Sequence, residues 1–240
     1  MSVGPRARVA GAGCFIVMEG GEGVGKTTQW QCLTHGLERA GHRVVALREP
    51  GGTPAGDMLR GVLLDPSSTL APATEALLFA ASRAQLVESV IRPALEQDAV
   101  VLVDRFLLST YAYQGAGRGM PLDTLRAINA AATGDIAPDL TLLLTMSLDE
   151  ALQRMTERGS ADRMEREDRA FHSRVHRAFG AAADVAWQAE HPEIGPVRTV
   201  DAHGTVDEVT ARCVGALTMH WPARFAAPGS SSVPAEAARG

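Results

Sequence analysis

The chain has 240 residues, of which 45% are hydrophobic and 21% are charged, and 23 basic against 28 acidic side chains give a formal net charge of −5. This composition excludes a disordered or collagen-like protein and is enough for a buried core. The acidic balance argues against nucleic acid as a partner, because a general nucleic-acid binder needs a basic face.

Short apolar runs alternate along the chain with longer amphipathic stretches. Residues 1–13 carry no hydrophobic period and are predicted to form a flexible N-terminal arm, residues 14–221 a single domain, and residues 222–240 a disordered tail. The apolar runs have the length of strands buried on both faces. They are Cys14–Met18, Arg43–Leu47, Val100–Val103, Leu140–Met146 and Val197–Val200.

The stretches between these runs carry helix signals. Residues 27–40 end at Gly41, and Thr53 followed by Pro54 is typical of a helix start. Capping boxes are predicted at residues 147–150 and 205–208. Alternating strands and helices predict an α/β fold, with about five parallel strands, helices on both faces, and ligands bound beyond the carboxyl ends of the strands.

The sequence favours a cytoplasmic protein that does not bind a membrane. Its apolar runs are far shorter than the roughly 20 residues that span a bilayer. The three cysteines, Cys14, Cys32 and Cys213, include no CxxC pair and suit a reducing compartment.

The first strand is followed by a phosphate-binding loop. The segment GGEGVGKTT at 20–28 matches GxxxxGK[ST], and its Lys26 is the only lysine beside 22 arginines. In such a loop the backbone N–H groups and the start of the next helix bind phosphates, the lysine reaches the β and γ phosphates, and Thr27 offers a hydroxyl to Mg²⁺. The predicted ATP-binding residues are Gly20, Gly21, Glu22, Gly23, Val24, Gly25, Lys26, Thr27 and Thr28.

A carboxylate follows the run Val100–Val103. Asp104 ends this predicted strand, where it can orient Mg²⁺ directly or through water. The alternative is a purely structural role, in which Asp104 forms an ion pair with its neighbour or caps the next helix. The phosphate-binding loop in the same sheet favours the metal interpretation.

Three arginines near strand ends suggest a second, anionic substrate. Arg48 and Arg105 follow predicted strands, and Arg83 lies four residues after Phe79 on one helix face. Planar guanidinium groups bind two phosphate oxygens at once, and an aromatic ring can stack on a base. Taken singly, Arg83 is equally compatible with a solvated helix charge and Phe79 with the core.

These segments resemble the thymidylate kinase family. The resemblance rests on REPGGT at 48–53, LLFAASRAQL at 77–86 and DRFLLSTYAYQGAGRG at 104–119, and it extends from about Phe15 to Trp221. It implies a nucleoside monophosphate kinase fold, phosphorylation of dTMP to dTDP with ATP and Mg²⁺, and a homodimer. The dTMP-binding residues that it implies are Glu22, Arg48, Phe79, Arg83, Arg105, Ser109, Thr110, Tyr113 and Gln114.

Within the family, the resemblance implies different roles for these residues. Phe79 would stack on thymine, and the arginines would hold the dTMP phosphate. Tyr113 would crowd the ribose 2′ position, and Glu22 would lie near the 3′-hydroxyl and the metal. Phe106 departs from the family, which more often has Tyr or His after Asp-Arg.

The phosphate-binding loop lacks the arginine that some members carry there. Residues 154–169 resemble the family's lid over ATP and would supply this charge, which is the type with the catalytic arginine in the lid. Arg158 and Arg163 are the candidates, and Arg163 is preferred for its Asp-Arg-x-Glu setting. The alternative is a solvated helix face, which mixed charges at helical spacing usually form.

The phosphate of dTMP is already a nucleophile, so no general base is required. Catalysis then rests on Lys26, Mg²⁺ on Thr27 and Asp104, Arg105 and a lid arginine. Two alternatives remain open on the residues alone. One is another P-loop nucleotide or deoxynucleoside kinase, and the other is a non-catalytic nucleotide-dependent switch.

Overall fold

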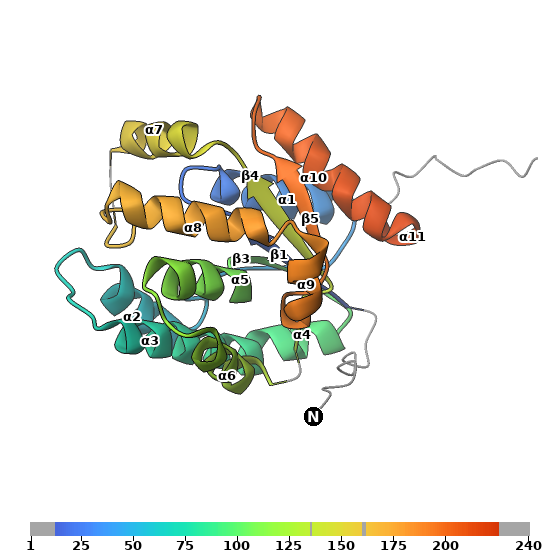
Figure 1. The fold of residues 1–240 in the computed structure, drawn as a ribbon. Coiled ribbons are helices and arrows are strands. Elements are labelled where there is room, and N and C mark those ends of the chain that lie inside the picture. The colour runs from blue at the N-terminus through green and yellow to red at the C-terminus, as the bar shows by residue number, and fades with distance from the viewer. Residues whose placement is uncertain (1–12, 135, 160–161, 226–240) are drawn as a thin grey trace, which may run out of the picture.

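The computed structural model describes residues 13–134, 136–159 and 162–225, which form a five-stranded parallel sheet with helices on both faces (Figure 1). The strand order is β2-β3-β1-β4-β5. This confirms the predicted α/β class and sheet. The strands are β1 (Cys14–Glu19), β2 (Val44–Arg48), β3 (Val100–Asp104), β4 (Leu140–Thr145) and β5 (Val197–Asp201).

The sheet separates two hydrophobic cores, because successive side chains of a strand point to opposite faces. In β1, Phe15 and Val17 belong to one core, whereas Ile16 and Met18 belong to the other. All six residues of β1 are buried, as expected for a central strand covered on both sides.

Helices α1 and α10 pack on one face of the sheet, and α3, α4, α6 and α8 contribute to the core on the other. No helix in the described ranges is long and apolar enough to cross a membrane. The longer helices are α1 (Lys26–Arg39), α2 (Pro54–Leu64), α3 (Pro72–Leu86), α6 (Leu122–Thr133), α7 (Leu148–Arg158), α8 (Arg169–Ala181) and α10 (Val206–His220). The shorter ones are α4 (Arg92–Glu96), α5 (Leu107–Thr110), α9 (Val185–Glu190), α11 (Pro222–Phe225), the π-helical segments η1 (Val87–Ile91) and η2 (Tyr111–Gly117), and the 3₁₀ segment η3 (Pro192–Ile194).

Two of the three predicted N-terminal helix caps form as expected and one forms in part. The Thr53 hydroxyl accepts from the backbone N–H of Gly56, and the box at Thr205 and Glu208 is complete. At the start of α7, Ser147 accepts from the Glu150 N–H, but the Glu150 carboxylate does not return to the backbone. The same carboxylate oxygen accepts from the Ser147 hydroxyl and lies 2.8 Å from His203 Nε2, so side-chain contacts replace half of the box.

The predicted tail begins too early. Residues 222–225 form α11, and Phe225 is buried with its ring 5.5 Å from that of Trp221 and 5.1 Å from that of His42. An aromatic anchor therefore holds the chain on α10 past Pro222. Residues 1–12 of the predicted arm and 226–240 of the predicted tail lie outside the described residues.

The carboxyl ends of β1, β2 and β3 lie at one edge of the sheet. The register pairs Met18 with Asp104 and Arg48 with Asp104, so residues that end three different strands come together. Glu19, Arg48 and Asp104 are the last residues of these strands. This edge is where α/β sheets bind ligands, and the candidate site lies there.

Candidate active site

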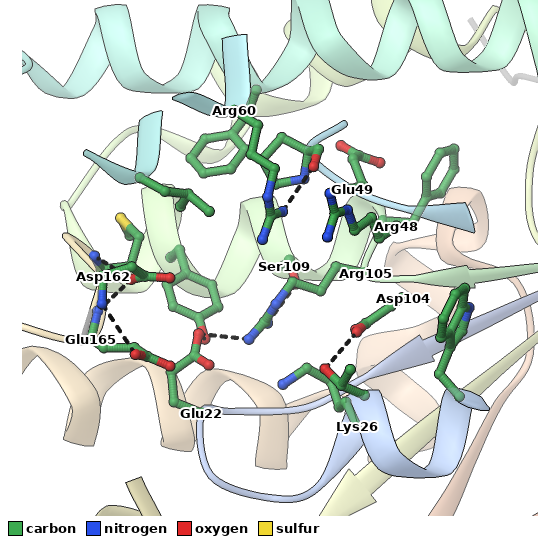
Figure 2. Close-up of a pocket in the computed structure, with 18 of the residues that line it drawn as sticks. Glu22, Lys26, Arg48, Glu49, Arg60, Asp104, Arg105, Ser109, Asp162 and Glu165 are labelled. Carbon is green, nitrogen blue, oxygen red and sulfur yellow. Dashed lines mark hydrogen bonds and ion pairs between the residues drawn. The ribbon is translucent and has the colours of Figure 1, made fainter. Parts of the chain in front are cut away.

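A cavity of about 1160 Å³ opens at the carboxyl ends of β1, β2 and β3. The loop before α1 forms one wall, the segment after β2 and the helices α2 and α3 form another, and residues of α7 and the following loop form a third. Figure 2 shows Lys26, Arg48, Arg60 and Arg105 directed into this space from different elements.

Residues 20–25 connect β1 to α1 through a tight backbone turn. Gly23 has a φ of 75°, and a Cβ there would lie 2.0 Å from the Ala151 carbonyl oxygen of α7. Gly25 caps α1 in the left-handed conformation with a φ of 88°. Only glycine adopts these conformations without strain, so the glycines let the loop curl against α7, and the start of α1 offers backbone N–H groups that suit an anion.

Lys26 is the first residue of α1 and is buried. Its Nζ donates a 2.6 Å hydrogen bond to the carbonyl oxygen of Gly21 in the same loop. Burial, reinforced by the nearby Arg105, lowers the pKa of Lys26 to about 8. The buried ammonium therefore carries a desolvation cost, and the negative charge of a bound phosphate would offset this cost.

The next residue of α1 contacts the end of β3. The Thr27 hydroxyl donates to Asp104 Oδ2 at 3.2 Å, whereas the buried Asp104 Oδ1 has no hydrogen-bond partner among the described residues. No group of three or more His, Cys, Asp or Glu side chains within those residues could hold a metal. Two oxygen ligands suit Mg²⁺ nonetheless, because Mg²⁺ usually takes one or two protein ligands and completes its shell with water and substrate phosphates.

Glu22, Arg105 and Tyr113 form a charged cluster beside the loop. Arg105 Nη2 and the Tyr113 hydroxyl donate to Glu22 Oε1 at 2.6 and 2.7 Å. Burial by itself raises the pKa of Glu22, but Arg105, Lys26 and Tyr113 outweigh it and lower that pKa to about 2. Glu22 is thus a permanent anion that holds Arg105 in place.

Arg105 occupies a strained backbone position with a φ of 72°. Its Nη1 donates to the Gly20 carbonyl oxygen at 3.1 Å and to the Ser109 hydroxyl at 3.2 Å, and its guanidinium lies 5.1 Å from the Tyr113 ring centroid. Such strain persists only where the surroundings enforce it and is frequent at functional sites. These contacts place one guanidinium between the phosphate-binding loop and the rest of the cavity.

Two further arginines face Arg105 from the second wall. Arg48, at the end of β2, is exposed in the cavity, and Arg60 of α2 donates from Nη1 to the Pro50 carbonyl oxygen at 2.9 Å (Figure 2). Burial, followed by the like charge of Arg48, lowers the pKa of Arg60. Guanidinium groups that repel one another in this way form a binding site for a dianion.

Arg83 also lines the cavity but is already engaged. Its side chain is 2% exposed, lies 2.6 Å from Glu49, and donates to Asn129 at 2.7 Å and to the Phe106 carbonyl oxygen at 3.2 Å. Burial raises the pKa of Glu49 to about 7 despite this arginine. Arg83 Nε is the group that keeps no partner within the described part of the chain.

The Phe106 ring is buried rather than presented to the cavity centre. It lies 5.1 Å edge-on from Phe15, and the guanidinium carbon of Arg83 lies 5.4 Å from its centroid. The backbone N–H of Phe106 donates to Glu19 Oε1 at 2.8 Å. Phe106, where the family more often has Tyr or His, therefore adds apolar surface behind Arg83.

An aromatic and polar pocket lies between α3 and η2. Phe79 is half-buried and lines the cavity, while Leu77, two residues earlier, is 57% exposed on another side of α3. Thr110 and Gln114 line the same cavity and are buried. The alternative that Phe79 is only a core residue is thus not favoured.

The predicted lid contributes unevenly to the cavity. Arg154 and Arg158 of α7 line it, and Arg158 pairs with Glu165 across the loop. Arg163 does not line it: this side chain is buried and donates to Glu75 at 2.7 Å and to the Leu63 carbonyl oxygen at 2.7 Å. The geometry therefore favours Arg158 over Arg163. Residues 160 and 161 of the predicted lid lie outside the described residues.

Most of the predicted site residues share this one cavity. Gly20, Gly21 and Val24 are the loop residues that do not line it: the first two offer carbonyl oxygens to Arg105 and Lys26, and Val24 packs in a core. The predicted residues that line the cavity are Glu22, Gly23, Gly25, Lys26, Thr27, Thr28, Arg48, Phe79, Arg83, Asp104, Arg105, Ser109, Thr110, Tyr113, Gln114 and Arg158.

Arg60 and Arg154 line the cavity although no sequence motif marks either of them as a site residue. Arg60 lies on α2 immediately after the REPGGT segment, so its proximity to that motif was the available signal. Arg154 is the first residue of the predicted lid. The lid holds several arginines among acidic residues, so no local pattern separates Arg154 from the others.

Comparisons with known proteins agree with this geometry. A family model described as Thymidylate kinase matches residues 18–192. A thymidylate kinase of Deinococcus radiodurans is 47% identical over 206 residues, covering 86% of this chain and 97% of the relative. Those of Gloeobacter violaceus and Syntrophotalea carbinolica are 49% and 45% identical, and the matches cover 82% of this chain in each case and 90% and 92% of the relatives.

Proposed function

The chain belongs to the thymidylate kinase family and phosphorylates dTMP to dTDP, and we propose that it does so with Mg-ATP in the cavity at the carboxyl ends of β1, β2 and β3. The observation that carries this proposal is the pairing of two unlike phosphate sites in one cavity. Lys26 and the glycine loop form the first, and the guanidinium groups of Arg48, Arg60 and Arg105 form the second.

The loop of residues 20–28 binds the phosphates of ATP in this proposal. Its free N–H groups and the start of α1 meet the β and γ phosphates, and Lys26 exchanges its bond to Gly21 for the γ-phosphoryl oxygens. Mg²⁺ would be held by Thr27 and by the unpartnered oxygen of Asp104, where it supplies neutralising charge on the phosphates.

The second phosphate site binds dTMP. Arg48 and Arg60 hold the phosphate from the side of β2 and α2, and Arg105 reaches it from the side of the loop. A phosphate monoester is largely dianionic at neutral pH, so its oxygen attacks without a general base. Arg105 touches both the loop and the acceptor side, which suits it to align donor and acceptor in line.

The pocket between α3 and η2 holds the nucleoside. Phe79 stacks on thymine, and Ser109, Thr110 and Gln114 provide polar groups near the base. Tyr113 is fixed by its bond to Glu22, and this ring together with Glu22 favours a deoxyribose. The Nη groups of Arg83 are already hydrogen-bonded within the protein. Arg83 therefore contributes to this pocket by the shape of its side chain and by the donor Nε, which has no partner among the described residues.

Arg158 is the lid residue that we propose to contact the transferred phosphoryl group, with Arg154 beside it. Both line the cavity, and the partner of Arg158 is a glutamate of the lid itself, so a phosphoryl group can replace that partner. Closing the lid would also exclude water, which protects the ATP from hydrolysis.

We further propose a homodimer in the cytoplasm. The exposed apolar residues Met58 and Val62 of α2 and Leu77 of α3 lie on two helices that pack together, which supports an interface on this side. Cys14, Cys32 and Cys213 are free thiols, which suits a reducing compartment.

An assay that couples ADP formation to NADH oxidation tests the proposal. Mg-ATP is offered with dTMP, dUMP, dCMP, dGMP, dAMP and thymidine in turn. We expect rapid turnover with dTMP, weaker turnover with dUMP, and no turnover with thymidine, because the arginines require an acceptor phosphate. Turnover with thymidine in place of dTMP would favour a nucleoside kinase, and nucleotide binding with none of these activities would favour a switch.

A further inference from the structure

Glu75 is a buried carboxylate directly behind the nucleoside pocket. It lies on α3, one helical turn before Phe79, and is 0% exposed. Gln114 Nε2 donates to its Oε1 at 2.9 Å, and Arg163 Nη1 donates to its Oε2 at 2.7 Å. Arg118 adds two hydrogen bonds, at 3.1 and 2.9 Å. The cavity reaches Gln114, whereas Glu75 stays behind it.

The surroundings keep Glu75 ionised. Burial alone raises its pKa, but the hydrogen bonds from Arg118, Gln114 and Arg163 outweigh burial, and the pKa is lowered. An ionised carboxylate only accepts hydrogen bonds and never donates. Gln114 must therefore turn its NH₂ group, not its carbonyl oxygen, toward Glu75.

This constraint decides which group Gln114 offers to a ligand. An amide carries one acceptor and two donors, and Glu75 takes one donor, so the carbonyl oxygen of Gln114 points elsewhere. Gln114 of η2, Thr110 at the end of α5 and Phe79 of α3 line the same cavity. The amide oxygen is thereby available as an acceptor to a planar base stacked on the Phe79 ring.

We infer that Glu75 is a positioning residue that selects the base: it fixes the Gln114 amide so that its oxygen accepts the N3 proton of thymine. This inference rests on the proposed binding of dTMP in this pocket. Thymine and uracil carry a proton on N3, whereas N3 of cytosine is itself an acceptor. A carbonyl oxygen that cannot rotate away repels cytosine, and an amide free to rotate would accommodate either base.

The test compares base discrimination in the wild type and in Glu75→Gln. The neutral side chain can accept or donate, so the Gln114 amide loses its single orientation. We expect the ratio of kcat/KM for dTMP to kcat/KM for dCMP to fall at least tenfold, with dUMP following dTMP. An unchanged ratio in the folded variant would overturn the inference. If the wild type itself does not phosphorylate dTMP, the proposed function fails instead.

Arg118→Met is the matched control. Arg118 donates to both oxygens of the same carboxylate, and within the described residues no hydrogen bond joins its side chain to that of Gln114; Arg163 remains to keep Glu75 ionised. We expect Arg118→Met to lower the melting temperature while the dTMP to dCMP ratio changes less than threefold. If both variants lose discrimination equally, Glu75 acts as a structural clamp and the inference is overturned.

A second measurement does not depend on the folding of any variant. N3-methyl-dTMP lacks the N3 proton but keeps the sugar, the phosphate and both carbonyl groups. We expect it to bind the wild-type protein at least tenfold more weakly than dTMP in a calorimetric titration. Binding as tight as that of dTMP would show that no acceptor reads N3, and would overturn the inference.

Discussion

The donor and acceptor halves of the cavity are built in opposite ways. The donor half is a single segment, residues 20–28, whose glycines, lysine and threonine are consecutive and whose ammonium bonds to its own loop. The acceptor half is collected from β2, α2, α3, β3 and η2, so that residues 48 and 114 of the chain line one cavity. Arg105 joins the halves through Gly20 and Glu22.

This difference determines how each half tolerates change. In the contiguous loop each interaction with phosphate depends on one residue, and no neighbouring side chain can replace the ammonium group of Lys26. The acceptor half has several guanidinium groups around one space, so removal of one leaves others in place. Substitutions on the donor side should therefore reduce kcat severely, and substitutions on the acceptor side should chiefly raise KM for dTMP.

Lys26→Arg has the largest expected effect. Arg is charged at every accessible pH, so the variant keeps the positive charge and changes only the shape of the side chain. The planar guanidinium group does not fit a loop in which Lys26 Nζ lies 2.6 Å from the Gly21 oxygen. We expect kcat to fall by about 10³-fold with an unchanged melting temperature, because a transition-state contact is lost. Near-normal turnover would show that the loop does not bind the γ-phosphoryl group.

Arg158→Met should rank second, and Arg163→Met separates the two lid candidates. Arg158 lines the cavity, whereas Arg163 is held by Glu75 and the Leu63 carbonyl oxygen. We expect Arg158→Met to lower kcat by about 10²-fold with little change in KM for dTMP. Arg163→Met should change kcat much less and lower the melting temperature. The opposite ranking would restore Arg163 as the catalytic residue.

Arg60→Met tests the redundancy of the acceptor half. Arg48 and Arg105 remain in this variant, so the chemistry should continue once dTMP is bound. We expect KM for dTMP to rise about thirtyfold with kcat within a factor of three, since one hydrogen bond to a charged group is lost. Arg39→Met, an exposed arginine at the end of α1, is the control and should leave both constants unchanged. A large fall in kcat would mean that Arg60 contacts the transferred group.

The same difference explains what could be predicted from the sequence. The five strands are apolar runs with a clear length, and the phosphate-binding loop is a local pattern, so both were predicted with small errors at the ends. Arg48 and Arg105 stand out because they follow predicted strands, and Phe79 because it shares a helix face with Arg83; the family motifs add the roles that these residues would have. The convergence of Arg60 on the same space depends on the path of α2 after the turn at residues 49–53, which no local pattern encodes.

Buried charges were the least predictable feature. Arg158 and Arg163 have similar neighbours in the chain, yet one lines the cavity and the other is buried against Glu75. Glu75 itself looks like an ordinary acidic residue in the first turn of a helix, where the helix dipole favours it. Only the packing of η2 and the lid around α3 shows that this carboxylate is enclosed.

The smallest effect that we predict is a pH dependence confined to the donor half. Lys26 is charged below its pKa, which burial and Arg105 lower to about 8 in the free protein, so its charge is lost as the pH rises through 8. Because kcat/KM reports the free enzyme, kcat/KM for ATP should fall about fivefold between pH 8 and pH 9. Acceptor binding depends on arginines, which remain charged, so kcat/KM for dTMP at saturating ATP should stay constant over the same range. Lys26→Arg should retain low but constant activity, and a flat ATP profile in the wild type would show that Lys26 keeps its proton despite burial.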